Sequence, residues 1–261
     1  TEWENSEKRF KDAPLGGGVF TVSYEKETEP GKKETWYGVT GEEGKINISR
    51  ASLALLKAFL ETAGGVDSIQ AAEIAAALWD WRDEDDDPLT GGAENSYYQT
   101  LNPSYPCHDE AFESLHESLL VKGMGDELLR RLAPYMTVFG SGKINVNTAD
   151  AVVLRSVAYA SGGQSPAACE SLVAKLIAFR KGGGVFREPV SMAMLRQMGE
   201  VMALQDEERS LLMAMTEMLT LRSTCFGGTA YGKVKGGSTA QSRIDFVFDL
   251  KQMTRVYWYE R

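Results

Sequence analysis

Histidine and cysteine are scarce in this 261-residue sequence, which contains two histidines and three cysteines. These side chains supply many of the nucleophile-base pairs and zinc sites of enzymes. The cysteines show no Cys-x-x-Cys spacing, and the sequence has no Gly-x-Ser-x-Gly, Walker A or His-Glu-x-x-His motif. A triad hydrolase, a P-loop enzyme and a zinc protease are therefore unsupported, and we expect no enzymatic activity.

Positive charge and long apolar runs are also in short supply. The 28 Lys and Arg residues are outnumbered by 37 Asp and Glu residues, which gives a net charge of −9. Such a chain has little general attraction for nucleic acid or anionic lipid. No apolar run approaches the roughly 18 residues that span a bilayer, and the sequence begins at Thr1 without a signal peptide. We expect a soluble part excised from a longer protein.

The cysteines Cys107, Cys169 and Cys225 lie far apart in the sequence. An odd number allows one disulfide with one free thiol, or three reduced side chains buried as small hydrophobic residues. Both alternatives remain open from the sequence.

Both ends of the chain are predicted to form strands. Residues 18–24 alternate apolar and polar side chains, and residues 35–39 can pair back on them as a hairpin. The same alternation recurs at 219–226, 243–250 and 254–259, around glycine-rich turns. These segments indicate an antiparallel sheet. Its apolar side, for example Ile244, Phe246, Phe248 and Leu250, needs a cover from residues near Trp3 and Phe10, another chain or the helical domain.

Between residues 50 and 218 the apolar residues recur at helical spacing, and six to eight helices are predicted. Examples are Leu53, Leu56 and Leu60; Phe112, Leu115 and Leu119; and the stripe that follows the N-cap Ser165 and Pro166. Strands that flank a helical region indicate an α+β fold with an inserted helical domain. The predicted bounds are 1–43 and 219–261 for the sheet domain, and 44–218 for the helical domain.

An internal repeat joins residues 44–65 to residues 142–163, with eight of 22 aligned positions identical at a spacing of 98 residues. Each copy reads as a turn, a short extended stretch and a capped helix. The alternative is that both copies are merely well-capped helices, which are common.

The acidic loop at residues 80–94 is the strongest candidate site. Counted from its first ligand, it places oxygen ligands at positions 1, 3, 5, 7 and 12 of a calcium loop: Asp83, Asp85, Asp87, the carbonyl of Leu89, and Glu94. Pro88 stands where such loops have glycine, so the match to an EF-hand is partial. A solvated acidic helix end is the alternative, but the spacing favours calcium over that alternative and over magnesium.

The segment 119–132 resembles a helix-hairpin-helix, in which backbone N–H groups can hold a phosphate. Asp126 and Glu127 occupy the start of its second helix and repel phosphate, so a structural hairpin is favoured.

Four motifs occur in a fixed order along the chain. The first is the strand segment 20–23 followed by Gly44-Lys45-Ile46-Asn47, and the second is the acidic loop, which continues to Tyr97-Tyr98. The third is the helical hairpin 120–135, and the fourth is Ile144-Asn145-Val146-Asn147-Thr148-Ala149. This order resembles general secretion pathway protein K, the large minor pseudopilin of type II secretion systems. The resemblance covers residues 16–260.

The resemblance implies a pilin-like antiparallel sheet with a large helical insertion, and an inner-membrane N-terminal helix that this sequence does not include. It implies a periplasmic structural subunit of a Gram-negative bacterium. With minor pseudopilins I and J it would form the tip of the pseudopilus, prime filament assembly and support export across the outer membrane. It also implies bound calcium, which is carried over to the acidic loop, whereas Asn145 and Asn147 are carried over only as structural residues.

Two other functions were weighed. A helix-hairpin-helix nucleic-acid-binding module is the main alternative, which the net charge of −9 disfavours. A metal-dependent hydrolase that uses residues 80–94 would need a base that the sequence does not identify.

Overall fold

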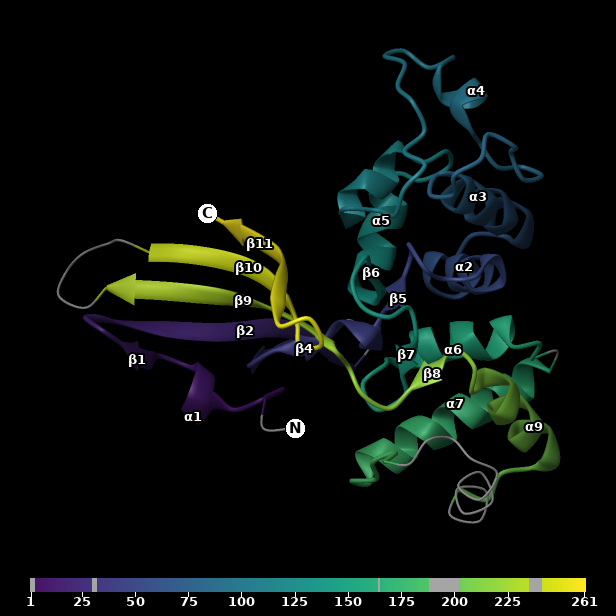
Figure 1. Cartoon of the computed structure of the whole chain (residues 1–261). Coiled ribbons are helices and arrows are strands. Elements are labelled where there is room, and N and C mark those ends of the chain that lie inside the picture. The colour runs from purple at the N-terminus through teal and green to yellow at the C-terminus, as the bar shows by residue number, and fades with distance from the viewer. Residues whose placement is uncertain (1–2, 30–31, 164, 188–201, 235–240) are drawn as a thin grey trace. The chain divides into compact units, whose positions relative to one another are not determined.

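The computed structural model describes residues 3–29, 32–163, 165–187, 202–234 and 241–261. The chain divides into two compact units, one of Thr1–Glu42 with Ser223–Arg261 and one of Glu43–Arg222 (Figure 1). The first is an antiparallel sheet and the second is mainly helical, so the predicted α+β class is confirmed. No described helix is both long and apolar enough to cross a membrane.

The sheet unit is built from strands that pair in the order β1-β2-β9-β10-β11. These strands are Ala13–Leu15, Gly18–Glu29, Cys225–Val234, Gln241–Asp249 and Thr254–Glu260. The shorter strands β3 (Lys32–Tyr37) and β4 (Thr40–Gly41) pair with β2 and β9, and helix α1 is Glu7–Phe10. The predicted hairpin is confirmed, because Ser23 lies opposite Tyr37 in an antiparallel register.

The single strand predicted at residues 219–226 is wrong, because this segment divides between the two units. Leu219–Thr220 forms β8, which pairs in parallel with β7 (Ile144–Asn145), and β9 starts only at Cys225. Leu219 is buried in the helical core, and the carbonyl of Leu221 accepts a hydrogen bond from the Asn147 amide. These contacts hold residues 219–221 in the helical unit. The prediction had assigned them to the sheet from the alternation of apolar and polar residues alone.

The helical unit consists of two similar halves. The first half runs through β5 (Ile46–Asn47), α2 (Leu53–Phe59, extended by a π-helical turn Leu60–Gly64), α3 (Ser68–Asp80), α5 (Asp126–Leu132) and β6 (Met136–Thr137). The second half runs through β7, α6 (Ala151–Ala160), α7 (Pro166–Lys181), α9 (Asp206–Met215) and β8. In each half the first and last strands pair in parallel. Helices α2 and α6 pack together, and the hydroxyls of Thr62 and Ser156 lie 2.6 Å apart.

Two partly buried arginines show that the repeat is structural and extends beyond the predicted segments. Arg82, which follows α3, donates hydrogen bonds to the carbonyls of Ile48 and Ala51. Arg180, which lies 98 residues later in α7, donates to the carbonyls of Val146 and Ala149, the positions equivalent to Ile48 and Ala51. Each arginine therefore ties the end of the second helix of its half to the turn before the first helix.

The remaining helices are short. They are α4 (Asn95–Tyr98) and the 3-10 turns Glu42–Gly44, Leu115–Leu120 and Ala133–Tyr135. The helix predicted from Phe112, Leu115 and Leu119 is thus only the six-residue 3-10 turn, which begins after the cap Ser114 and excludes Phe112. Asn145 and Asn147 lie where expected of structural residues: the Asn145 side-chain oxygen accepts the Asn147 backbone N–H, and the Asn147 amide also donates to the Phe186 carbonyl.

Candidate metal centre

Asp80, the last residue of α3, fixes the start of the acidic loop. Its carboxylate is completely buried and accepts backbone N–H groups of Leu89 at 3.2 Å and of Ala93 at 2.8 Å. A side chain at Gly92 would place its Cβ 1.9 Å from Asp80 Oδ2, so only glycine fits there. The loop is therefore folded back against the end of the helix that precedes it.

A second segment, residues 107–109, is held beside the loop by hydrogen bonds that its backbone N–H groups donate. The N–H of Cys107 donates to Asn95 Oδ1 at 2.8 Å, and the N–H of Asp109 donates to the Trp81 carbonyl at 3.1 Å. Asp109 adopts a left-handed backbone with φ 55°, which aspartate tolerates better than most residues. These contacts bring Cys107 and Asp109 next to Glu94.

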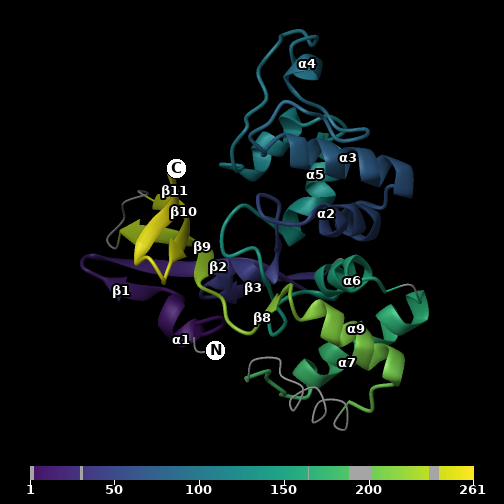
Figure 2. The ribbon, with the colours of Figure 1, turned by 45° about the vertical axis from the view of Figure 1, so that its right-hand side comes forward.

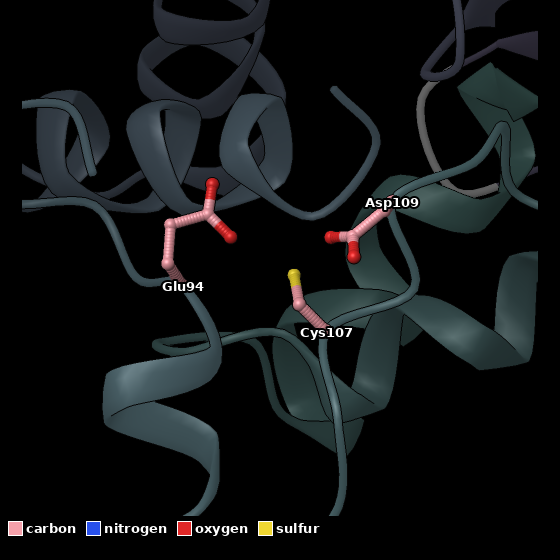
Figure 3. A group of neighbouring side chains, drawn as sticks. All are labelled: Glu94, Cys107 and Asp109. Atoms are coloured by element: carbon pink, nitrogen blue, oxygen red, sulfur yellow. The ribbon is translucent and has the colours of Figure 1, made fainter. Parts of the chain in front are cut away.

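Five side chains converge at this point. Ligand atoms of Glu94, Cys107 and Asp109 lie within 4.8 Å of one another, and Figure 3 shows the three side chains pointing toward a common space. Asp80, Asp83 and Glu94 form a second group within the same distance. Glu94 belongs to both groups, so the two form one continuous cluster.

Four carboxylate oxygens of this cluster are buried without a normal hydrogen-bond donor. They are both Oε atoms of Glu94 and one Oδ atom each of Asp83 and Asp109, and no N–H or O–H group of the described residues donates to them. Burying such a group without a partner costs roughly 1–3 kcal/mol, and more when it is charged. A proton or a cation is needed to compensate.

The carboxyl groups respond to this environment as expected. Burial raises the pKa of Glu94 to about 7, opposed by a hydrogen bond from the Cys107 thiol and helped by the nearby carboxylates of Asp80 and Asp83. Burial also raises the pKa of Asp80 and of Asp83, against the effect of the backbone hydrogen bonds to Asp80. The pKa of the Cys107 thiol is raised to about 12, chiefly by burial and by Glu94, so this thiol is neutral at pH 7.

The structure brings together part of the predicted ligand set. Asp83 and Glu94 lie in the cluster, whereas Asp85 and Asp87 are exposed and lie outside both groups. Asp85 instead accepts the N–H of Asp87, and the Leu89 carbonyl accepts the N–H of Gly92 at 2.8 Å. This arrangement is not that of an EF-hand loop, in which every second residue points at one ion.

Three members of the cluster were not among the predicted ligands. Asp80 belongs to the acidic run but reads as the end of a helix, and Cys107 and Asp109 follow Glu94 by 13 and 15 residues without a metal-binding spacing. The one sequence signal at this point is the adjacent pair Cys107-His108, which has no metal-binding spacing to Glu94. All three cysteines are free and buried, which settles the alternative left open by the sequence.

The predicted hairpin supports the loop from the other side. Lys122 donates from Nζ to the carbonyls of Gly91 at 3.0 Å and Gly92 at 3.1 Å. The glycine turn that follows opens onto a hollow of about 690 Å³ whose lining includes Asp67, Asp126 and Glu127. Three carboxylates outnumber the one cation of the lining, Arg131, so the hollow is unfavourable for phosphate and the geometry favours the structural interpretation of the hairpin.

Comparisons with known proteins give one consistent match. Residues 40–141 match the family model for type II secretion system (T2SS) protein K. Over 86 residues the chain is 35% identical to type II secretion system protein K of Klebsiella pneumoniae and 42% identical to that of Dickeya chrysanthemi. The matched segment is 32% of this chain but only 26% and 23% of those relatives, so it spans about a quarter of their length.

The fold match is longer. A chain of the crystal structure of the GspK-GspI-GspJ complex from the enterotoxigenic Escherichia coli type 2 secretion system superposes with a TM-score of 0.66. The match covers 95% of this chain and 81% of that chain, at 17% sequence identity. The resemblance inferred from the motifs is thus confirmed, by sequence for residues 40–141 and by fold for nearly the whole chain.

Proposed function

We propose that this chain is a minor pseudopilin of a type II secretion system, protein K, and acts as a structural subunit. The observation that carries the proposal is the coincidence of two matches. The sequence match to protein K lies mostly in the helical unit, and the fold match extends over both units. A small sheet interrupted by a helical insertion, with both chain segments of the sheet hydrogen-bonded to each other, is a specific arrangement rather than a common one.

The partners we propose are minor pseudopilins I and J, because the solved chain of similar fold belongs to a complex with those two proteins. In this proposal the three subunits sit at the tip of the pseudopilus, where they prime filament assembly and support export across the outer membrane. The chain would act in the periplasm. Its contribution is bulk and contact surface rather than chemistry, since the described titratable cluster consists of carboxylates around one neutral thiol.

We further propose that the cluster binds calcium. Calcium takes six to eight oxygen ligands at 2.3–2.6 Å and prefers carboxylates. The buried oxygens of Asp83, Glu94 and Asp109 that lack donors suit such an ion, and a divalent charge offsets the repulsion among the carboxylates. Asp80 already accepts two backbone N–H groups, so its main role is to hold the loop in place.

Calcium at this point would be a stabilising crosslink. The proposed ligands come from the end of α3, the start of α4 and the segment 107–109, three stretches that a few backbone and side-chain hydrogen bonds join. An ion that binds only the folded chain at a hundredfold excess over its Kd adds about 2.7 kcal/mol to stability. We therefore expect calcium to order the loop rather than to activate a substrate.

The test of the proposed function is assembly. The chain is mixed with folded soluble domains of minor pseudopilins I and J from the same organism, and the mixture is analysed by size-exclusion chromatography with light scattering. We expect one stoichiometric complex and no binding of a labelled DNA duplex at 150 mM salt. Separate elution of the three proteins together with submicromolar DNA affinity would instead favour the helix-hairpin-helix alternative.

A further inference from the structure

The exposed apolar side chains of the molecule gather on the sheet unit. Ten of the seventeen large hydrophobic residues that are exposed in the described part of the chain belong to it, and four of them are consecutive: Val256, Tyr257, Trp258 and Tyr259 in β11. Isolated exposed apolar residues are normal, whereas this run leaves apolar side chains exposed on both faces of one strand, because successive strand residues point to opposite faces. Every residue of β11 is exposed.

Strand β11 lies at an edge of the sheet. Within the described residues it pairs with β10 alone, and Figures 1 and 2 both show it beside β10 at the end of the strand order. Sheet edges are usually protected by short strands, proline or covering segments, because free backbone groups recruit other strands. β11 has seven residues and no proline, and although Arg255 and Glu260 are charged and the pairing with β10 is irregular between Val247 and Phe248, residues 257–260 stay in regular register.

The register shows which backbone groups face outward. Arg243 and Arg261 exchange both backbone hydrogen bonds, so Tyr259, two residues away, also points its backbone toward β10. Trp258 and Glu260 lie opposite Phe246 and Ile244 in the alternate pairs, and their N–H and C=O groups are therefore directed away from the sheet. An added strand would find two residues with free backbone groups in the correct spacing.

Charge distinguishes the chain segment that contains this edge from the rest of the protein. Residues 223–261 carry six basic and three acidic side chains, a net +3, whereas residues 1–222 have a net charge of −12. On the face of Tyr259, the Arg261 guanidinium lies 5.0 Å from the Tyr259 ring, and Arg243 lies 5.8 Å from the ring of Tyr231. Both guanidiniums also pair with the Asp245 carboxylate, at 3.0 Å from Arg243 and 3.7 Å from Arg261, so the three side chains together keep one positive charge. Arginine and tyrosine are the residues enriched at the energetic centres of protein interfaces.

We propose that the outer edge of β11 docks an extended acidic segment of a partner pseudopilin, which adds to the sheet as a further strand. Backbone hydrogen bonds to Trp258 and Glu260 set its register. Carboxylates on one side of the added strand face Arg243 and Arg261, and apolar side chains on its other side pack on Trp258. This inference rests on the proposed function, because it takes the partner from the assembly with pseudopilins I and J.

The experiment compares matched variants in binding to a preformed pair of pseudopilins I and J, measured by titration calorimetry at 150 mM salt. Glu260→Pro removes an outward N–H that makes no bond within the sheet, whereas Glu260→Ala keeps it. We expect Glu260→Pro to raise the Kd about tenfold and Glu260→Ala to leave it within about twofold. Hydrogen exchange of β10 amides checks that the sheet stays folded in both variants.

A charge pair gives a second, independent readout. Arg261→Glu should raise the Kd about tenfold, while Arg130→Glu on the exposed side of α5 should change it little. Equal binding by the wild type and all four variants overturns the docking surface and leaves the proposed function standing. No binding by the wild type overturns the proposed function, and with it this choice of partner.

The same set of proteins also tests two other possible occupants of the edge. A wild-type dimer in light scattering that becomes a monomer in Glu260→Pro would show that a second copy of the chain occupies the edge, and would overturn the partner. Submicromolar binding of a labelled single-stranded oligonucleotide that Arg261→Glu abolishes would identify nucleic acid as the occupant, and would likewise overturn the proposal.

Discussion

Glu94 is the residue on which the candidate metal centre depends. It is 1% exposed, belongs to both carboxylate groups and has two oxygens that no N–H or O–H group reaches. An interior carboxylate of this kind is stable only when it is protonated or bound to a cation. If the proposed calcium binds here, the contribution of Glu94 to stability depends on calcium as well as on pH.

The first prediction separates Glu94 from the exposed carboxylates of the same loop. Adding calcium to the metal-free wild type should raise the Tm, and EGTA should reverse the rise. In Glu94→Gln this shift should disappear, because a neutral amide offers one oxygen and no charge. Asp87→Asn, a change of equal size at an exposed position, should keep the shift.

Differential scanning fluorimetry with and without calcium gives this readout. The metal-free form of Glu94→Gln should melt no lower than the metal-free wild type, since the substitution removes a buried acid without donors. A calcium shift that survives in Glu94→Gln and is lost in Asp87→Asn would place the ion on the exposed side of the loop instead.

The second prediction concerns the pH dependence of calcium affinity. The pKa of Glu94 is raised from 4.5 to about 7, chiefly by burial, and the ion must displace the proton that this pKa retains. Apparent affinity should therefore fall about tenfold from pH 8 to pH 6. Titration calorimetry in buffers of different ionisation enthalpy should show close to one proton released per ion at pH 6.

The stability of the metal-free protein should change in the opposite direction. Between pH 4.5 and 7 the folded Glu94 binds a proton that the unfolded chain does not, so the free energy of unfolding rises as the pH is lowered through 7. Urea unfolding of EGTA-treated protein at pH 5.5 and 7.5 measures the difference. A difference of equal size in Glu94→Gln would assign it to other groups.

At the scale of elements, the acidic loop shows what sequence can and cannot predict about the site. The oxygen-rich spacing directed attention to residues 83–94, because that density of carboxylates is local information, and the structure places two of the predicted ligands, Asp83 and Glu94, in one cluster. The contact with Cys107 and Asp109 is not local. It depends on the N–H of Asp109 reaching the carbonyl of Trp81, a hydrogen bond between backbone groups that leaves no trace in side-chain identity.

The repeat illustrates the same limit in the fold. Eight identities over 22 positions predicted two similar helix starts, and the structure confirms them in α2 and α6. The pairing of β7 with β8 could not be predicted, since two-residue strands carry no measurable alternation. That pairing is what removes residues 219–220 from the sheet unit.

The third prediction tests the equivalence of the two halves through their arginines. Arg82→Met and Arg180→Met each leave two carbonyls without their guanidinium donor. Each should lower the free energy of unfolding by about 2 kcal/mol or more. Arg155→Met, which removes a partly exposed ion pair with Glu170, should lower it by less than about 1 kcal/mol.

Urea titrations followed by circular dichroism at 222 nm measure all three variants. If only one of the two arginine variants proved destabilising, the two halves would share a backbone fold, but their arginines would not have equivalent roles in stability. If neither exceeded Arg155→Met, the carbonyls would find water or other donors when the arginine is removed.

At the scale of the whole molecule, the two units differ in how they are stabilised. The helical unit contains the described hydrophobic core, in which residues such as Leu56, Leu154 and Leu172 are completely buried. In the sheet unit the buried apolar residues of the described chain are Val22, Cys225 and Val247. A sheet with so little core of its own gains stability from whatever covers it.

One face of this sheet has the form of a trough. Gly228, Ala230 and Gly232 follow one another along the central strand β9 on the same face. Larger apolar residues flank them in register, with Phe20 opposite Gly232, Val22 opposite Ala230, Ile244 opposite Ala230 and Phe246 opposite Gly228. Ile244 and Phe246 are only half-buried, as the alternation in the sequence predicted for a face that needs a cover. The Gly38 carbonyl already lies 3.3 Å from the position of a Cβ at Gly228, whereas a Cβ at Gly232 would meet no atom of the described chain within 4 Å, so the Gly232 end of the row lets an apolar cover approach the backbone closely.

The last prediction compares the two faces of β10 by the same kind of substitution. Val247 is 6% exposed on the face opposite to Ile244, so Val247→Ser should destabilise the chain by about 2 kcal/mol or more. Ile244→Ser should cost clearly less, because part of its surface is already in water. It should also lower the fluorescence of a bound hydrophobic dye and reduce concentration-dependent association of the chain in light scattering, since it breaks the apolar surface of the trough. A wild-type chain that binds no dye and stays monomeric at high concentration would show that the trough does not bind a partner or a further segment. That result would count against a pilin-like sheet.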